Sequence, residues 1–142
     1  MITTLASKSL NIAATGPRPK ALAVIAWMAT GLFAAAMTLS GVAYVVGVKA
    51  VLDGIRQLGY PDYFLRLLGV AKLLGVAGLF LPRPRVREWA YAGFTFDLVA
   101  AIASHLLTGT ASHAPAAALA LALMLLSYTL RHRMTAGGVE RP

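Results

Sequence analysis

Two neighbouring apolar stretches decide the fold of this chain: residues 63–81 read YFLRLLGVAKLLGVAGLFL, and residues 89–107 read WAYAGFTFDLVAAIASHLL. Each can cross a bilayer as one helix, because a spanning helix needs about 20 residues. Each also carries an ionisable residue near its centre, Lys72 in the first and Asp97 in the second. An intramembrane charge costs about 2.5–3.5 kcal/mol on insertion scales and is usually paired. The short loop between the stretches predicts antiparallel helices with both charges at one depth.

Two further apolar runs flank this pair, at about residues 21–48 and 114–130. Of the 142 residues, 58% are hydrophobic and 13% are charged, whereas a soluble domain has about 25% charged residues. The chain is therefore predicted to be an all-α integral membrane protein, an up-down-up-down bundle of four transmembrane helices over residues 21–131. Residues 1–20 and 132–142 are predicted to be tails.

The first apolar run has an alternative interpretation as a signal peptide, because basic residues precede it and small residues follow at 34–36. The apolar region of a signal peptide is only about 7–15 residues long. This run continues to Val48, well past that length. We therefore expect a retained transmembrane helix.

The formal net charge of +8 would be compatible with nucleic-acid binding, but the positions of the basic residues indicate another cause. In a four-span arrangement nine of them fall on one side of the membrane: Lys8, Arg18, Lys20, Arg83, Arg85, Arg87, Arg131, Arg133 and Arg141. Loops rich in Lys and Arg stay on the cytoplasmic side. Both tails and the 83–87 loop are therefore predicted to be cytoplasmic, with the lipid bilayer and no nucleic acid as a partner.

Polar side chains recur near the predicted outer ends of three spans: Tyr44, Arg66, Ser104 and His105. The inner half of the spans is almost wholly apolar, so we expect a polar vestibule open to the non-cytoplasmic side. Helical phase places Asp97, Ser104 and His105 on one face of the third span. Arg66 lies about 120° around its helix from Lys72, so these two are not both expected to line one cavity.

These residues form two candidate sets. The candidate catalytic or proton-handling groups are Lys72, Asp97 and His105, and the candidate ligand-binding groups are Arg66, Ser104 and Tyr44. Structural alternatives remain open for all of them. Lys72 and Asp97 can form an ion pair that fixes helix register, Arg66 can snorkel to the headgroups, and the others can lie at the interface.

The residue types in the chain limit the cofactors and metals that it can bind. The chain has no cysteine, which excludes thiolate catalysis and Cys-ligated clusters within it. His105 and His113 lie on different predicted segments without the tight spacing of metal ligands, so no metal is expected.

Specific residues between positions 60 and 108 resemble the DoxX-like family of small bacterial four-helix membrane proteins: Gly69, Lys72, Gly75, Pro82, the Glu88-Trp89-Ala90-Tyr91-Ala92-Gly93 box and Ser104-His105. The resemblance implies four transmembrane helices in a bacterial inner membrane. It also implies a loose link to redox metabolism, because the family name comes from a small subunit of a thiosulfate:quinone oxidoreductase. Other relatives look like membrane partners of soluble redox proteins, and a distant animal branch looks like a receptor-assembly chaperone.

Two classes of function follow as hypotheses. The first is an accessory or ligand-binding subunit linked to redox metabolism, with a quinone or similar lipophile entering between helices and a soluble or membrane redox protein as partner. The second is a structural or chaperone-like assembly protein without a ligand. A standalone membrane enzyme with acid–base chemistry on a lipophilic substrate, and a homo-oligomeric transporter, are further alternatives.

Overall fold

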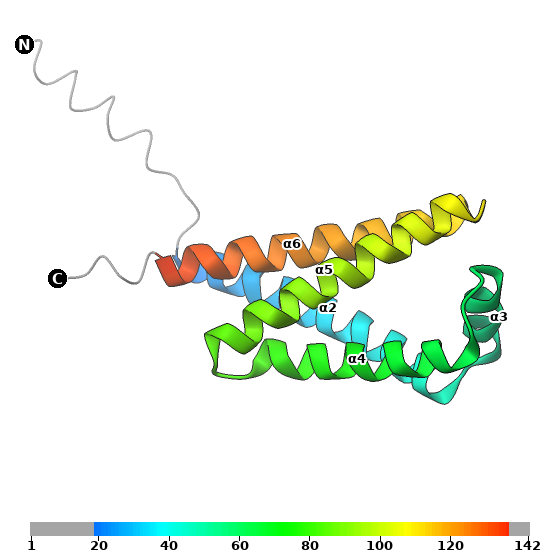
Figure 1. The fold of residues 1–142 in the computed structure, drawn as a ribbon. Coiled ribbons are helices and arrows are strands. Elements are labelled where there is room, and N and C mark those ends of the chain that lie inside the picture. The colour runs from blue at the N-terminus through cyan, green and yellow to red at the C-terminus, as the bar shows by residue number, and fades with distance from the viewer. Residues whose placement is uncertain (1–18, 137–142) are drawn as a thin grey trace, which may run out of the picture.

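The computed structural model describes residues 19–136, all of them in helices or short connections (Figure 1). The predicted tail residues 1–18 and 137–142 lie outside the described part of the chain. The elements are α2 (Pro19–Val46), α3 (Lys49–Gln57), α4 (Asp62–Phe80), α5 (Pro84–Leu107), η1 (Ala111–His113) and α6 (Ala114–Ala136). Four helices are long and apolar enough to cross a membrane, as the sequence predicts.

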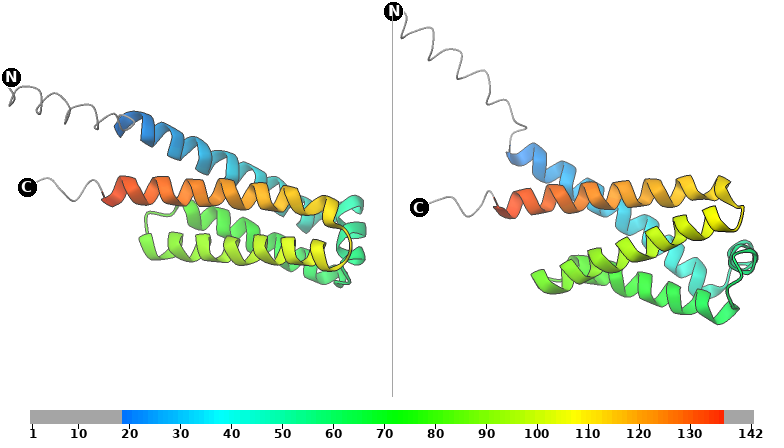
Figure 2. Two further views of the ribbon diagram at one scale, coloured as in Figure 1. Left: turned by 90° about the horizontal axis from the view of Figure 1, so that it is seen from above. Right: turned by 45° about the horizontal axis from the view of Figure 1, so that its top comes forward.

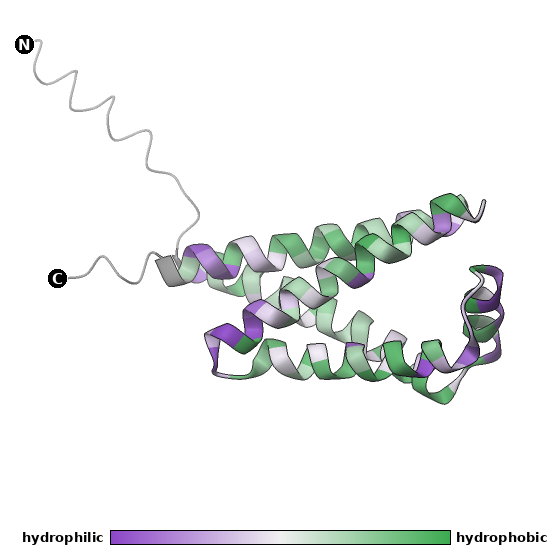
Figure 3. Cartoon of the chain, viewed as in Figure 1, coloured by the Kyte–Doolittle hydropathy of each residue, from purple (hydrophilic) through white to green (hydrophobic). Residues whose placement is uncertain are grey.

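The four long helices form a bundle in which successive helices run in opposite directions (Figures 1 and 2). Helix α2 packs against α4 and α6, and α5 packs against the same two helices. The start of α2, the end of α6 and the α4–α5 turn share one end of the bundle, and α3 and η1 lie at the other. Hydrophilic residues gather towards these two ends, with mainly apolar helix between them (Figure 3).

Three of the helix boundaries differ from the sequence expectation for local reasons. Helix α2 ends at Val46 because Gly47 adopts a φ of +75°, which suits glycine. Helix α5 begins at Pro84, well before Trp89, since proline is favoured in the first turn of a helix. Helix α6 continues to Ala136, past the predicted end at residue 130. Its last turns therefore include the basic residues Arg131 and Arg133, which follow the apolar run.

The buried core joins all four long helices. Phe33 of α2 and Phe94 of α5 meet edge to face, with ring centroids 5.0 Å apart, an arrangement that aromatic quadrupoles favour. The core cluster consists of Phe33, Met37, Leu79, Tyr91, Phe94, Leu98 and Met124. Because α2 supplies two of these side chains, the first apolar run is an integral part of the bundle.

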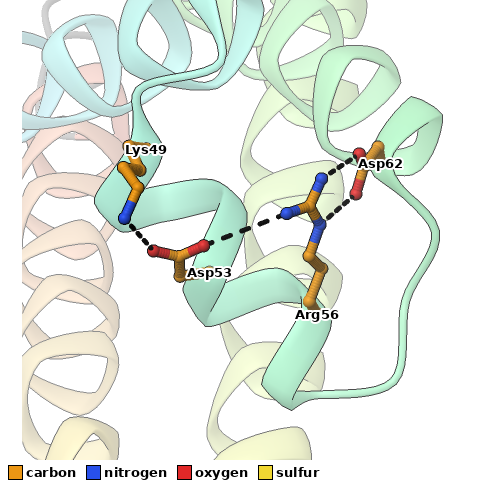
Figure 4. Close-up of polar contacts among 4 residues, drawn as sticks. All are labelled: Lys49, Asp53, Arg56 and Asp62. Carbon is orange, nitrogen blue, oxygen red and sulfur yellow. Dashed lines mark hydrogen bonds and ion pairs between the residues drawn. The ribbon is translucent and has the colours of Figure 1, made fainter.

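Helix α3 lies across the end of the bundle and is tied to the start of α4 (Figures 1 and 4). The Arg56 guanidinium donates from Nε to Oδ1 of Asp62 at 2.8 Å and from Nη2 to Oδ2 at 2.6 Å. These hydrogen bonds, with the charge of Asp62, raise the pKa of Arg56 above its ordinary value. On the same helix Lys49 lies 3.6 Å from Asp53. Both pairs are exposed, whereas Ile55 of α3 is buried.

Candidate functional site

Lys72 of α4 and Asp97 of α5 form an ion pair in the middle of the bundle. The Lys72 ammonium donates a hydrogen bond to Oδ2 of the Asp97 carboxylate. The Lys72 side chain is 7% exposed and that of Asp97 is 12% exposed. Two charges withdrawn from water in this way are costly unless they face each other. The structure therefore brings together the two charged residues that sequence analysis placed at one depth.

Two glycines flanking Lys72 on α4 allow its neighbours to approach closely. A Cβ atom on Gly69 would lie 2.8 Å from the carbonyl oxygen of Gly41 and 2.8 Å from Cβ of Tyr44, both on α2. A Cβ atom on Gly75 would lie 2.8 Å from Cζ of Phe94 on α5. Small residues let membrane helices pack at short range. Lys72 is consequently enclosed between α2 and α5.

Tyr44, a predicted ligand-binding residue, lies beside the ion pair. The Lys72 Nζ is 5.5 Å from the centroid of the Tyr44 ring, within the range at which the face of an aromatic ring attracts a cation. Tyr44 is partly buried near the end of α2. The ammonium therefore has a carboxylate on one helix and an aromatic ring on another.

A cavity of about 350 Å³ adjoins the ion pair between α4 and α5. We call it the α4–α5 cavity; its walls are Leu68, Ala71, Lys72, Gly75, Trp89, Ala90, Gly93, Phe94 and Asp97. Lys72 and Asp97 are the charged members of this set, and the others are apolar or aromatic. Trp89 is 81% exposed at the rim. The cavity is thus an apolar space with one charged pair in its wall.

The position of this cavity differs from the expected vestibule. On α5 its wall runs from Asp97 back to Trp89, towards the α4–α5 turn and away from α3. Arg66 is exposed and lines a separate cavity at the α3 end, with Asp62 and Tyr63. Arg66 and the Lys72–Asp97 pair therefore line different cavities, in agreement with the 120° separation of Arg66 and Lys72 around α4.

Ser104 and His105 make their contacts away from the ion pair. The Ser104 hydroxyl lies 3.1 Å from the hydroxyl of Tyr60, in the segment between α3 and α4. Nδ1 of His105 lies 2.9 Å from Oγ1 of Thr110, and its ring centroid is 5.7 Å from that of His113. Although Ser104 and His105 share a helical face with Asp97, they contact different neighbours from those of Asp97. They line neither the α4–α5 cavity nor the cavity that contains Arg66.

A buried chain of hydroxyl groups was missed by sequence reasoning. Thr30 of α2, Ser127 of α6 and Tyr91 of α5 are almost fully buried. The Ser127 Oγ lies 2.6 Å from Oγ1 of Thr30 and 2.9 Å from the Tyr91 hydroxyl, and Thr30 also donates to the carbonyl oxygen of Ala26. Hydroxyl residues are common in membrane helices, so no local signal in the sequence distinguishes these three.

Within residues 19–136, no group of three or more His, Cys, Asp or Glu side chains lies close enough to hold an ion. The adjacent rings of His105 and His113 supply two nitrogen-bearing groups, fewer than the three or four protein ligands that a zinc site uses.

Comparison with known proteins agrees with this architecture. A sequence model of the DoxX-like family matches residues 28–127, which include most of α2 and all of α3, α4 and α5. No curated protein sequence and no solved structure shows a significant match to the chain. The matched region contains Lys72, Asp97 and every wall residue of the α4–α5 cavity. This multi-pass membrane protein belongs to the DoxX-like family.

Proposed function

We propose that the α4–α5 cavity binds the polar head of a lipophilic small molecule, and that the protein is an accessory, ligand-binding membrane subunit linked to redox metabolism. The observation that carries this proposal is the cavity of about 350 Å³ whose charged wall residues are Lys72 and Asp97. Small-molecule sites are typically apolar clefts of about 300–1,000 Å³ with a few polar groups that orient the ligand. The cavity matches that description.

A quinone-type head group suits the chemistry of the wall. A carbonyl oxygen accepts hydrogen bonds, and the cavity wall offers two donor groups, the Lys72 ammonium paired with Asp97 and the indole N–H of Trp89. The aromatic Trp89 and Phe94 offer flat apolar surfaces for a ring. In this proposal Lys72 and Asp97 bind the head group and exchange protons with it. His105, Ser104 and Arg66 lie outside the site, and Tyr44 supports Lys72 from α2.

The proposed membrane is the bacterial inner membrane, with the α4–α5 turn and the ends of α2 and α6 facing the cytoplasm. The arginines at positions 83, 85 and 87 support this orientation. Because the chain has no native cysteine, Arg85→Cys and Gln57→Cys can each be labelled with a membrane-impermeant maleimide in intact cells. We expect labelling of Gln57→Cys alone, and labelling of Arg85→Cys alone would reverse the orientation.

The ligand is tested by purifying the full chain in mild detergent and analysing the organic extract by mass spectrometry. We expect a stoichiometric lipophile that is lost in Lys72→Met and in Gly93→Leu. Gly93 lines the cavity, and a Cβ atom there would have nothing within 4 Å, so leucine fills the space without disturbing the ion pair. Gly31→Leu is the matched control, because Gly31 also has nothing within 4 Å but lies on the exposed surface of α2.

Equal amounts of lipophile in the Gly93→Leu and Gly31→Leu proteins would overturn the proposed site. The competing function is a structural or assembly protein, favoured by the burial of the ion pair and by the Tyr44 ring on its ammonium. The charge swap Lys72→Asp with Asp97→Lys separates the two functions. An assembly protein should regain both stability and partner binding in the swapped form, whereas a ligand-binding protein should regain stability without the lipophile.

A further inference from the structure

A second cavity, of about 410 Å³, lies at the opposite end of the bundle from the α4–α5 cavity. Three elements enclose it: the end of α2 with the following turn, α3, and the first turns of α4. We call it the α2–α3–α4 cavity; its walls are Val46, Gly47, Leu52, Asp62, Tyr63 and Arg66. Because it shares no wall residue with the α4–α5 cavity, it requires a separate explanation.

Arg66 supplies a cation to this cavity. Among the described residues, none forms a hydrogen bond or an ion pair with the Arg66 guanidinium. Its positive charge attracts the Asp62 carboxylate without direct contact. Both oxygens of the Asp62 carboxylate already accept hydrogen bonds from Arg56 (Figure 4). The Asp62 carboxylate is therefore paired with Arg56 and not with Arg66. The planar, five-donor guanidinium of Arg66 remains available for an anion, and it matches the geometry of phosphate.

The remaining walls are suited to lipid. Val46, Leu52 and the Tyr63 ring are apolar, and Tyr63 is 72% exposed. Arg66 lies four residues into α4, which is about 6 Å along the helix from its start and near the boundary between headgroups and hydrocarbon. A cation beside apolar side chains, one turn into a helix long enough to span the membrane, fits a phosphate that carries hydrocarbon chains.

We propose that the α2–α3–α4 cavity is a phospholipid site in which Arg66 binds the phosphate and the apolar walls hold the glycerol backbone and the first acyl carbons. A free phosphomonoester offers the same anion to Arg66, but it would leave Val46, Leu52 and Tyr63 facing water. The apolar walls therefore favour the lipid source. Helix α3, tied to Asp62 through Arg56, contributes Leu52 to the wall of the site.

Native mass spectrometry of the full-length protein in detergent tests this assignment. The protein is delipidated and incubated with dioleoyl phosphatidylglycerol, with dioleoylglycerol, which has the same chains without phosphate, or with glycerol 3-phosphate. We expect one retained phosphatidylglycerol and about tenfold weaker retention in Arg66→Gln, since charge-assisted hydrogen bonds are lost. Lys49→Gln is the control, because it removes a charge from the same end of the molecule and its side chain is 93% exposed.

Arg56→Gln provides an independent check. It releases the Asp62 carboxylate, which can then pair with Arg66 one helical turn away. We expect weaker phosphatidylglycerol retention although Arg66 is intact. Equal retention by Arg66→Gln and Lys49→Gln would overturn the proposal, as would retention of dioleoylglycerol at the same level. Displacement of the lipid by millimolar glycerol 3-phosphate would overturn the lipid assignment. We expect Gly93→Leu to retain phosphatidylglycerol, because Gly93 lines only the α4–α5 cavity. Loss of this lipid in Gly93→Leu would place it in the α4–α5 cavity instead.

Discussion

The Lys72–Asp97 and Arg56–Asp62 pairs join a cation to a carboxylate in two contrasting surroundings. Lys72 and Asp97 lie between helices in the middle of the bundle, with side chains that are 7% and 12% exposed. Arg56 and Asp62 lie at the α3 end, with side chains that are 56% and 53% exposed. The second pair has the better geometry, since two parallel hydrogen bonds join the guanidinium to both carboxylate oxygens.

The difference shows that hydrogen-bond geometry alone does not determine how much an ion pair contributes to the stability of the fold. At the surface, water and salt replace a lost partner at small cost. In the middle of the bundle nothing replaces it, so removal of one partner leaves an uncompensated buried charge. The central pair should therefore control stability, and the α3-end pair should control the position of a local segment. Lys72→Met and Arg56→Gln test this contrast directly. Gly69→Ala and Ser127→Ala, which have intermediate expected effects, test the packing and the hydrogen bonds between the helices.

Lys72→Met should cause the largest loss. The Asp97 carboxylate would remain buried without its cation, and breaking a buried pair on one side costs about 3–5 kcal/mol. The measurement is thermal unfolding in one detergent, followed by circular dichroism. The double variant Lys72→Met with Asp97→Leu should recover most of the loss, because an apolar pair has no charge to compensate. Equal destabilisation of the single and double variants would contradict this explanation.

Gly69→Ala should follow, with a loss of about 1–3 kcal/mol from overpacking. The added Cβ atom meets backbone atoms of α2, including the Gly41 carbonyl oxygen at 2.8 Å and the Val45 nitrogen at 2.9 Å, which cannot rotate away. Gly31→Ala is the matched control, since nothing lies within 4 Å of its added atom. Unfolding temperatures of the two variants in the same detergent give the comparison, and a loss of equal size in both would show that α2 and α4 are not tightly packed.

Ser127→Ala should cost less, about 0.6–2 kcal/mol, which is the range for hydrogen bonds between membrane helices. It removes one partner each from Thr30 and Tyr91, although Thr30 keeps its bond to Ala26. Thr129→Ala serves as the control, because that exposed hydroxyl bonds only within α6, to Leu126. If both alanine variants unfold at the same temperature, the buried hydroxyl chain contributes nothing to stability.

Arg56→Gln should have the smallest effect on global stability, with no measurable change in unfolding temperature. Its ion pair with Asp62 is exposed, and salt screens such pairs. Hydrogen exchange should nevertheless become faster across α3, because the link between α3 and α4 is lost. A fall in unfolding temperature as large as that of Lys72→Met would remove the distinction between the two pairs.

Local properties of the chain account for what sequence analysis predicted correctly. Hydropathy and run length identify the four long helices, and the short connection after Phe80 makes α4 and α5 antiparallel. With both helices antiparallel, the depths of Lys72 and Asp97 follow from the rise per residue. The family resemblance rested on the same region and is confirmed by the match over residues 28–127.

Helix rotation and tilt account for what sequence analysis could not place. His105 and Ser104 share a nominal face with Asp97, yet they contact Thr110 and Tyr60 at the α3 end of the bundle. The half of the bundle towards the α4–α5 turn, apolar by composition, contains both the α4–α5 cavity and the buried hydroxyls of Thr30 and Ser127. These outcomes depend on which side of each helix faces a neighbour, and hydropathy carries no such information.

The sequence by itself determined that this is a four-span membrane bundle with a lysine and an aspartate at matching depth, because transfer free energy and helix rise act residue by residue. Only the tertiary structure decided that these charges touch and that a cavity adjoins them on the Trp89 side. Contacts and cavities arise from how separate helices pack. That packing depends on positions such as Gly69 and Gly75, where the absence of a side chain lets a neighbouring helix approach.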